Sequence, residues 1–295
     1  MIIVKLQGGL GNQLFQYALG RHLAQKNGTA LKLDISWYGT QTYRSFDLHD
    51  WSIIENLATD AEIRSFKKYR RKGRKIWFLY NYLFADESKY VREKGYAFDP
   101  KILELGSQAY LDGIWLSEKY FKGIEDIIRK EFRLRAPLPP AQSEIVRKME
   151  KSESVSVCIR RGDFVSDKKI SSIHGLLPLD YYERAVEYVA DRISNPHFFI
   201  FSDDIDWCRS NFKTGYPTTF VSDGHKNISS SQELWLMSSC KHTVNANSSF
   251  SWWASWLNQN REKIVIFPKK WFKEESRNAA SMVPESWVRL ENKFI

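Results

Sequence analysis

The most informative segment for the fold is Val155-Ser-Val-Cys-Ile-Arg-Arg-Gly-Asp-Phe164. Every second residue from Val155 to Ile159 is a branched apolar one, a pattern typical of one face of a buried β-strand. Two arginines, a glycine and an aspartate follow at once, so the charged group falls just past the carboxyl end of this strand. In open parallel α/β sheets, ligands bind at that edge. The stretch therefore predicts a central parallel strand with a charged binding site at its end.

The chemistry of this charged group suits an anion. Arg160 and Arg161 carry planar guanidinium groups, which match the geometry of phosphate or carboxylate better than lysine does. Gly162 permits a tight turn or a close approach of the backbone to a ligand. The alternative is a structural salt bridge at the strand end, in which Asp163 pairs with Arg161 and holds Arg160 in place. Taken alone, the stretch leaves both interpretations open.

The bulk composition is that of a globular protein. The chain has 295 residues, 43% of them hydrophobic, which is enough for one large or two ordinary domains. It has no apolar run of about 18 residues, so no transmembrane helix is expected. The apolar run Ile2–Val4 directly follows Met1 and indicates a first strand rather than a signal peptide.

The three cysteines, Cys158, Cys208 and Cys240, are odd in number and are not spaced like metal ligands. Neither a disulfide framework nor a zinc site is expected, and a reducing, cytoplasmic setting fits best.

The net charge of +9 favours anionic partners, which include nucleotides, nucleic acids and acidic membrane surfaces. Basic residues concentrate in Lys67–Lys75, which is either a solvated segment or a peripheral contact with anionic lipid or a phosphate-bearing acceptor. The sequence has no groove-reading or base-stacking motif, so a nucleic-acid partner is not expected.

A glycine-rich loop, Gly8-Gly-Leu-Gly-Asn12, follows the first strand and precedes a helical pattern that runs to about Lys26. A strand, a glycine loop and a helix in this order aim backbone N–H groups at an anion. The spacing is neither the dinucleotide fingerprint nor a P-loop. Gly9 and Gly11 are therefore candidates for contact with a ligand, and a purely structural turn is the alternative.

The second half of the chain alternates helical and strand patterns, which predicts a parallel, doubly wound sheet. The first half follows a looser version of the same rhythm. The proline-rich link Arg135–Ala141 is the best domain boundary. We therefore expect two facing Rossmann-type α/β domains with a cleft between them, residues 1–140 on the acceptor side and residues 141–295 binding the donor.

Two further places at predicted strand ends or helix starts can carry chemistry. Asp203 and Asp204 follow the apolar strand His197–Phe201, where a carboxylate can accept hydrogen bonds from guanine, bind Mg²⁺ or cap the next helix. Ser248 and Ser249 start a helix, where hydroxyl and free N–H groups can hold phosphate oxygens or serve only as caps.

The residue after these serines, Phe250, falls on the same helix face as Trp253 and Leu257, a spacing that predicts a core position. The helix start as a whole, Phe250 included, is a candidate donor-binding segment. Together, the arginine pair, the aspartate pair and this helix start describe a site for a nucleoside diphosphate.

The same segments resemble the glycosyltransferase family 11 α-1,2-fucosyltransferases of bacteria, and they span most of the chain in order. The matching segments are Gly8–Tyr17, Leu111–Phe121, Ile159–Phe164, Phe201–Asp204 and Asn247–Ala254. The resemblance implies a GT-B-like, inverting enzyme that needs no metal and no cofactor. It would move L-fucose from GDP-β-L-fucose to the 2-hydroxyl of a terminal galactose on a glycan acceptor. The alternative is a fucosyltransferase of another linkage or a different nucleotide-sugar transferase.

The resemblance also implies roles for individual residues. Related fucosyltransferases place the first arginine of the pair on the β-phosphate, which here is Arg160, and they place the loop asparagine, here Asn12, at the reaction centre. Family members commonly carry histidine where this chain has Cys158. No histidine or glutamate is clearly placed as the base that takes the acceptor proton, so Asp163 is the candidate.

Overall fold

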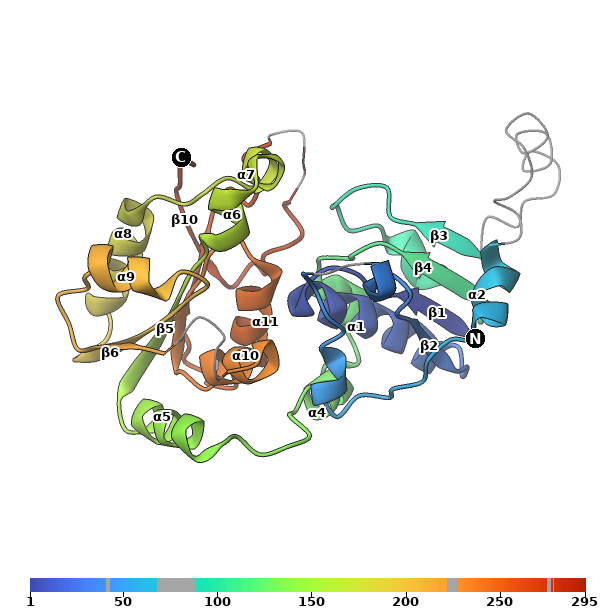
Figure 1. Cartoon of the computed structure of the whole chain (residues 1–295), viewed down its shortest axis with the longest axis horizontal. Coiled ribbons are helices and arrows are strands. Elements are labelled where there is room, and N and C mark those ends of the chain that lie inside the picture. The colour runs from blue at the N-terminus through green and yellow to red at the C-terminus, as the bar shows by residue number, and fades with distance from the viewer. Residues whose placement is uncertain (41–42, 68–88, 222–227, 275–276, 278) are drawn as a thin grey trace. The chain divides into compact units, whose positions relative to one another are not determined.

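The structure, a computed structural model, describes the whole chain except residues 41–42, 68–88, 222–227, 275–276 and 278. The chain divides into two compact units, Met1–Arg133 and Leu134–Ile295. The predicted boundary after residue 140 lies a few residues beyond this division, at the far end of the proline-rich link. Each unit has its own parallel sheet (Figure 1).

The sheet of the first unit runs in the order β2-β1-β4-β3, and all its described pairings are parallel (Figure 1). Its strands are β1 (Ile2–Lys5), β2 (Leu31–Asp34), β3 (Tyr90–Arg92) and β4 (Ala109–Asp112). From β1 the chain passes to β2 on one side, and it later fills the other side with β3 and β4. The direction of the connections therefore reverses between β1 and β4.

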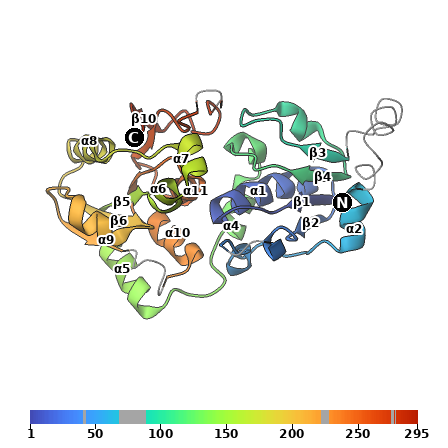
Figure 2. The same ribbon diagram turned by 45° about the horizontal axis from the view of Figure 1, so that its top comes forward.

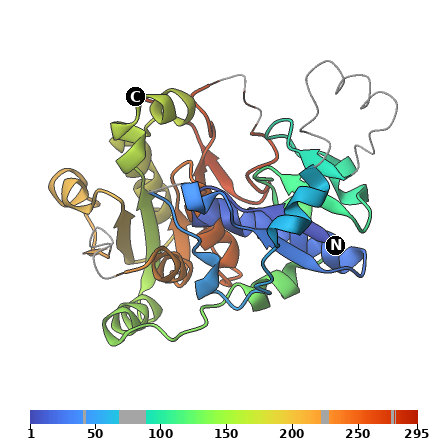
Figure 3. The same ribbon diagram turned by 45° about the vertical axis from the view of Figure 1, so that its right-hand side comes forward.

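Helices cover both faces of this sheet. Successive apolar residues of its strands point to opposite faces, so both faces must be buried. On one face, α1 (Leu10–Lys26) packs so closely that a Cβ at Gly20 would lie 2.2 Å from Val4 Cγ2. The helix α2 (Asp60–Lys67) lies on the other face (Figure 3). Its Ile63 and Phe66 form a core cluster with Ile3 and Tyr110. The remaining described helices are short: η1 (Tyr38–Thr40), η2 (Leu48–Asp50), η4 (Pro100–Glu104), η5 (Glu118–Phe121) and α4 (Glu125–Glu131).

The sheet of the second unit runs in the order β10-β9-β8-β5-β6-β7, again with parallel pairings throughout. Its strands are β5 (Glu153–Ile159), β6 (Pro196–Ser202), β7 (Thr218–Phe220), β8 (His242–Val244), β9 (Val265–Pro268) and β10 (Val288–Leu290). The chain fills β6 and β7 on one side of β5 and then β8, β9 and β10 on the other. Here the connections reverse between β5 and β8.

Helices cover both faces of this second sheet as well (Figures 1 and 2). Alternate residues of β5, from Val155 to Ile159, form the core with α8 (Leu179–Ala190) and α9 (Ile205–Asn211), as the sequence pattern predicted. On the opposite face lie α10 and α11, where Thr243 on β8 and Ser255 on α11 are hydrogen-bonded at 2.8 Å between hydroxyls. The helices of this unit are α5 (Pro140–Glu150), α6 (Gly162–Ser166), α7 (Lys168–His174), α8 (Leu179–Ala190), α9 (Ile205–Asn211), α10 (Ser230–Ser238) and α11 (Ser249–Leu257).

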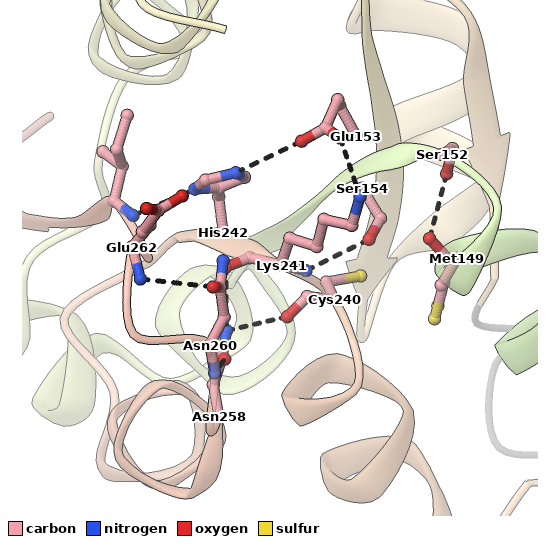
Figure 4. A network of polar contacts seen from close by, with 11 residues as sticks. Met149, Ser152, Glu153, Ser154, Cys240, Lys241, His242, Asn258, Asn260 and Glu262 are labelled. Atoms are coloured by element: carbon pink, nitrogen blue, oxygen red, sulfur yellow. Dashed lines mark hydrogen bonds and ion pairs between the residues drawn. The ribbon is translucent and has the colours of Figure 1, made fainter.

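A polar network ties the amino ends of β5 and β8 together (Figure 4). The Glu153 carboxylate accepts a hydrogen bond of 2.7 Å from Lys241 Nζ and lies 3.8 Å from His242 Nε2. The Lys241 backbone N–H donates to Ser154 Oγ at 3.0 Å. The network lies at the sheet edge opposite the predicted site, so we assign it to stability.

The predicted α/β class with two parallel sheets is confirmed. The sequence pattern missed the short edge strands β3 and β10, whose three residues each are too few to show a period. It also missed α6 and α7, which follow the arginine pair directly. Among the described residues, no helix is long and apolar enough to cross a membrane.

Candidate active site

The candidate site lies at the carboxyl ends of β5 and β8, where the chain connections of the second sheet reverse direction. Such a reversal opens a crevice, because the loops after the two strands leave toward opposite faces of the sheet. Arg160 follows β5 directly. Asn247 and Ser248 follow β8 and lead into α11. The arginine and serine segments predicted from the sequence therefore belong to two adjacent strand ends.

Arg160 is held by two carboxylates. One terminal guanidinium nitrogen, NH2, donates to Asp163 Oδ1 at 2.7 Å, and the other, NH1, lies 2.9 Å from Asp203 Oδ2. The Arg160 side chain is only 21% exposed. Burial by itself would lower its pKa, but the Asp203 and Asp163 carboxylates outweigh that effect and raise the pKa. Arg160 is therefore a permanent, fixed cation at the sheet edge.

One donor of Arg160 is not used by these pairs. Its Nε is buried and has no hydrogen-bond partner among the described residues. A buried donor left without a partner costs roughly 1–3 kcal/mol, so such a group in a folded protein calls for an explanation. A ligand oxygen at this edge would supply the missing acceptor.

Arg161 connects β5 to the neighbouring strand β6. Its backbone N–H donates to Asp203 Oδ1 at 2.8 Å, and its Nε donates to Asp204 Oδ2 at 3.1 Å. Its guanidinium carbon lies 3.5 Å from the centre of the Trp207 ring, a cation–π contact. Asp204 also caps α9 by accepting from the Trp207 backbone N–H. The side chain of Arg161 thus shapes the site by holding Asp204.

These contacts bear on the expected recognition of guanine by Asp203 and Asp204. Asp203 uses both carboxylate oxygens on the arginine pair, and Asp204 combines a helix cap with an ion pair. The cap expected as one alternative is therefore present at Asp204. Contact of either carboxylate with a base stays a prediction.

Gly162 is required by the packing of this network. A Cβ at this position would lie 2.6 Å from Asp203 Oδ2, closer than real Cβ atoms come to another heavy atom. The missing side chain lets the start of α6 approach the carboxylate that holds Arg160. This close approach is within the protein, whereas the sequence suggested a close approach to a ligand.

Asp163, the candidate base, lies in the first turn of α6 and pairs with Arg160 itself. An aspartate–arginine salt bridge is therefore present at this strand end, but the predicted pairing of Asp163 with Arg161 is wrong. Arg161 pairs with Asp204 instead, because the register of β5 and β6 brings that carboxylate to it. The Asp163 side chain remains 27% exposed. Its role as a base stays a prediction.

The start of α11 lies beside these groups in the sheet order. Ser248 caps the helix by accepting from the Phe250 backbone N–H at 3.3 Å. Ser248 and Ser249 are half-buried. Phe250 is also half-buried, so the core position expected from its helical spacing is wrong, whereas Trp253 and Leu257 are buried as expected. Phe250 begins the helix at the sheet edge, where the core ends.

Asn247 fixes the approach to this helix. It is 2% exposed, and its Nδ2 donates to the carbonyls of His174 at 2.9 Å and Trp271 at 3.0 Å. Its Oδ1 is buried without a partner among the described residues. Asn247 is therefore a second polar group at this edge that is only partly satisfied.

His174 is a site residue that sequence reasoning missed. Its ring stacks on Phe164 with the ring centres 5.3 Å apart, and Phe272 packs at the same distance. Its Nδ1 is buried and unpartnered in the described part of the chain. Burial lowers its pKa, the Asp163 carboxylate raises it, and Arg277 and Arg160 lower it, for a net decrease. His174 is thus a neutral imidazole near the Arg160 and Asp163 pair, and no spacing signal in the sequence indicates it.

Cys158, which stands where family members commonly carry histidine, points into the unit. It is buried, and burial raises its pKa to about 12. The thiol is therefore neutral and a weak donor. The other two cysteines, Cys208 and Cys240, are also buried and free.

In the first unit, the glycine loop forms the start of α1. Gly8 has a φ of 81°, which favours glycine, and a Cβ there would lie 2.6 Å from Asn12 Nδ2. Gly9 is the N-cap residue of α1, and Gly11 is buried in its first turn. The structure thus brings Gly9, Gly11 and Asn12 together, in a different unit from Arg160.

The described residues contain no cluster of three or more histidine, cysteine, aspartate or glutamate side chains that could hold a metal ion. The basic segment Lys67–Lys75 lies outside the described residues except for Lys67, the last residue of α2. Its predicted contact with anionic lipid stays a prediction.

Comparison with known proteins gives a family match over almost the whole chain. The sequence profile described as "Glycosyl transferase family 11" matches residues 1–291. The chain is 32% identical to an alpha-1,2-colitosyltransferase of Escherichia coli, over 99% of each chain. It is also 32% identical to the O-antigen biosynthesis glycosyltransferase WbnK of Escherichia coli, over 97% of this chain and 99% of the relative. A galactoside 2-alpha-L-fucosyltransferase SEC1 of Bos taurus is 26% identical over 97% of this chain and 73% of its own.

Among solved structures, the fold is similar to that of Arabidopsis thaliana FUT1, determined as a mutant in complex with GDP. The TM-score is 0.53 with 13% identity, and the match covers 96% of this chain and 74% of the other. This likeness supports a GT-B-like fold with two α/β units, as the sequence predicted.

We expect Gly162→Ala to weaken binding at this edge without unfolding the protein. The added Cβ would push Asp203 away and release one of the two carboxylates that hold Arg160, and the affinity for a nucleoside diphosphate, here probed with GDP, should fall by about 10-fold or more. Isothermal titration calorimetry with GDP measures this effect. Val165→Ala, an exposed position on the same helix, is the matched control. Unchanged GDP affinity in Gly162→Ala would show that the Asp203 contact does not matter for binding.

Proposed function

The chain belongs to glycosyltransferase family 11, and from that premise we propose that it transfers L-fucose from GDP-β-L-fucose to the 2-hydroxyl of a terminal galactose, with inversion and without a metal or other cofactor. Two of the relatives carry the α-1,2 or galactoside 2-α linkage in their names, which supports the proposed position of transfer. The name of a third, WbnK, places it in O-antigen biosynthesis, which supports an O-antigen unit as the acceptor.

The observation that carries the proposal is the largely buried Arg160 cation at the carboxyl end of β5. Its Nε has no hydrogen-bond partner among the residues that the structure describes. Departure of GDP from the sugar builds negative charge on the β-phosphate. A preorganised cation in a site of low dielectric stabilises such charge strongly, because it needs no reorganisation at the moment of reaction. In the proposed complex, Arg160 contacts the β-phosphate, and the N–H groups at the start of α11 receive the other phosphate.

The charge balance of the network suggests how the base becomes available. Arg160 and Arg161 face three carboxylates, those of Asp163, Asp203 and Asp204, so a phosphate must compete with at least one of them. Asp163 is the most readily displaced from Arg160, because its side chain is 27% exposed against 14% for Asp203. We propose that the donor phosphate takes the place of Asp163 on Arg160. The freed carboxylate then accepts the proton of the acceptor hydroxyl.

Metal independence in this proposal rests on the family resemblance. The cation proposed for the β-phosphate is the Arg160 guanidinium, which becomes available when the phosphate displaces Asp163. Asn12 remains a proposed residue of the reaction centre, and Gly9 and Gly11 remain proposed donor contacts. These roles rest on the resemblance of the glycine loop.

A second donor is favoured by the similarity to the colitosyltransferase. Colitose is fucose without its 3-hydroxyl, so the two donors differ by one hydrogen-bonding group. A site that hydrogen-bonds a substrate hydroxyl discriminates against the analogue that lacks it by about 10⁴-fold or more, whereas an apolar pocket does not. The ratio of kcat/KM for the two donors therefore decides between the two activities.

The decisive experiment incubates the protein with GDP-L-fucose or GDP-colitose and a panel of β-galactosides, and reads the linkage of the product by NMR. We expect an α-1,2-linked fucosyl product whose rate of formation survives excess EDTA. If the colitosyl product forms preferentially, the donor is GDP-colitose and not GDP-L-fucose. Loss of activity with EDTA that Mg²⁺ or Mn²⁺ restores would overturn metal independence.

We expect Arg160→Ala to lower kcat by roughly 10²–10³-fold, as removal of one group that stabilises developing charge does in other enzymes. Arg160→Lys should recover little of this loss, because a lysine cannot reproduce the planar fork that spans two carboxylates. Steady-state kinetics with the donor in excess measures both, and Arg209→Lys on α9 is the control for a change of the same type. A lysine variant with near wild-type turnover would contradict the role of Arg160.

Asp163→Asn tests the displacement of this carboxylate by the donor. If Asp163 is the base, its replacement by Asn should lower kcat by about 10²–10⁴-fold. GDP affinity should stay unchanged or rise, because the phosphate no longer competes with a carboxylate for Arg160. Asp167→Asn, which keeps a capping side chain at the start of α7, is the control. Parallel losses of GDP affinity and melting temperature in Asp163→Asn would assign Asp163 to a structural role instead.

A further inference from the structure

The first unit has a pocket of its own, at the carboxyl ends of its strands. The cavity has a volume of about 390 Å³, which is within the range of about 300–1,000 Å³ typical of small-ligand sites. Three of its lining residues, Lys5, Arg92 and Asp112, are the last residues of β1, β3 and β4. The direction of chain connections reverses between β1 and β4, so the pocket occupies the place in this sheet where a ligand is expected.

The rims of the pocket are tied together by the buried side chain of Gln16 on α1. Its Oε1 accepts from the Gln7 backbone N–H at 3.0 Å, and its Nε2 donates to the Gly113 carbonyl at 2.9 Å. Gln7 and Gly113 both line the cavity. The segment before the glycine loop and the turn after β4 are therefore held at a fixed separation.

Glu93 is fixed firmly in one wall of the pocket. Its two carboxylate oxygens accept from the backbone N–H groups of Ile114, at 2.7 Å, and Trp115, at 3.0 Å. A Cβ at Gly113 would lie 2.4 Å from Glu93 Cβ, so only glycine lets this turn close over the carboxylate. Trp115 holds a positive φ of 65°, a conformation that is strained for a bulky residue. Strain of this kind tends to be kept where it orients a functional group.

The charges around the pocket do not favour an anion. The Lys5 ammonium is already paired with the Asp112 carboxylate at 3.0 Å, and the Tyr90 hydroxyl donates to the same carboxylate at 2.5 Å. The other two charged residues of the lining, Arg92 and Glu93, have opposite charges, so the formal net charge of the lining is zero. Fixed acceptors and donors in balanced number, beside the ring of Tyr96, suit a neutral ligand rich in hydroxyl groups.

We propose that this pocket binds the acceptor saccharide, with Glu93 and Asp112 accepting hydrogen bonds from sugar hydroxyls, Arg92 donating to a sugar oxygen and Tyr96 contacting the sugar ring. The inference rests on the proposed function, because it takes the acceptor to be a galactoside. The first unit is already expected on the acceptor side, and the inference adds which pocket of that unit binds the saccharide and which side chains contact it.

The test compares Arg92→Ala and Tyr96→Ala with Lys94→Ala in the full-length protein. Lys94 is an exposed basic residue two positions from Arg92 and does not line the cavity. Steady-state kinetics should show a rise of about 10–100-fold in the KM for the galactoside in Arg92→Ala, as loss of a charged hydrogen bond predicts. Tyr96→Ala should raise the same KM, because the contact with the sugar ring is lost. The KM for the donor should not change, and Lys94→Ala should behave like the wild type.

Binding is measured separately, so that failure of the pocket and failure of the proposed activity can be told apart. Saturation-transfer NMR with lactose and methyl β-galactoside, in the presence of GDP, should show contact with the wild type and a weaker signal in Arg92→Ala. If transfer occurs but the acceptor KM of both pocket variants is unchanged, the pocket assignment is wrong. An equal rise in the donor KM would also overturn it. If the galactosides bind and the signal depends on Arg92 while no GDP-sugar is used, the pocket assignment stands and the proposed activity fails.

Discussion

The buried ion pairs of Arg160 are the constraint on which the arrangement of the second unit depends. A charge removed from water is tolerated only when other groups compensate it, and here Asp163 and Asp203 do so at 2.7 and 2.9 Å. Removal of one partner from such a pair is more costly than the pair is stabilising. The path of the backbone from β5 into α6 and the end of β6 must therefore hold both carboxylates beside Arg160 while no ligand is bound.

The central strand, the functional edge of the sheet and the helix caps are predictable from the sequence, because each depends on residues that are close together in the chain. The alternation from Val155 to Ile159 identified the central strand, since side chains of a strand point to its two faces in turn. The position of the arginines after that strand identified the functional edge. Ser248 was expected at a helix start, and it caps α11. Ser229, the first of three consecutive serines, forms a capping box at the start of α10 that is also readable from local spacing.

The rest depends on the register of distant segments, which local patterns do not contain. Asp203 meets Arg160 because β5 and β6 pair with Ile159 opposite Ser202, so the residues after the two strands emerge side by side. His174 reaches the site at the end of a helix that shows no clear amphipathic period. Glu93 follows a strand of three residues, and its partners lie in the turn after β4. No residue type or spacing near His174 or Glu93 predicts these contacts.

The contact between Gly162 and Asp203 restricts how this sequence can diverge. Any side chain at position 162 collides with the carboxylate at 203, and a shorter or neutral residue at 203 leaves the Arg160 cation with one partner fewer. A replacement of Arg160 leaves two aspartates facing each other without a cation between them. Each single change is harmful before a second can compensate it. We therefore expect Arg160, Gly162 and Asp203 to be conserved together among divergent relatives, while residues on the outer surface of α6 vary.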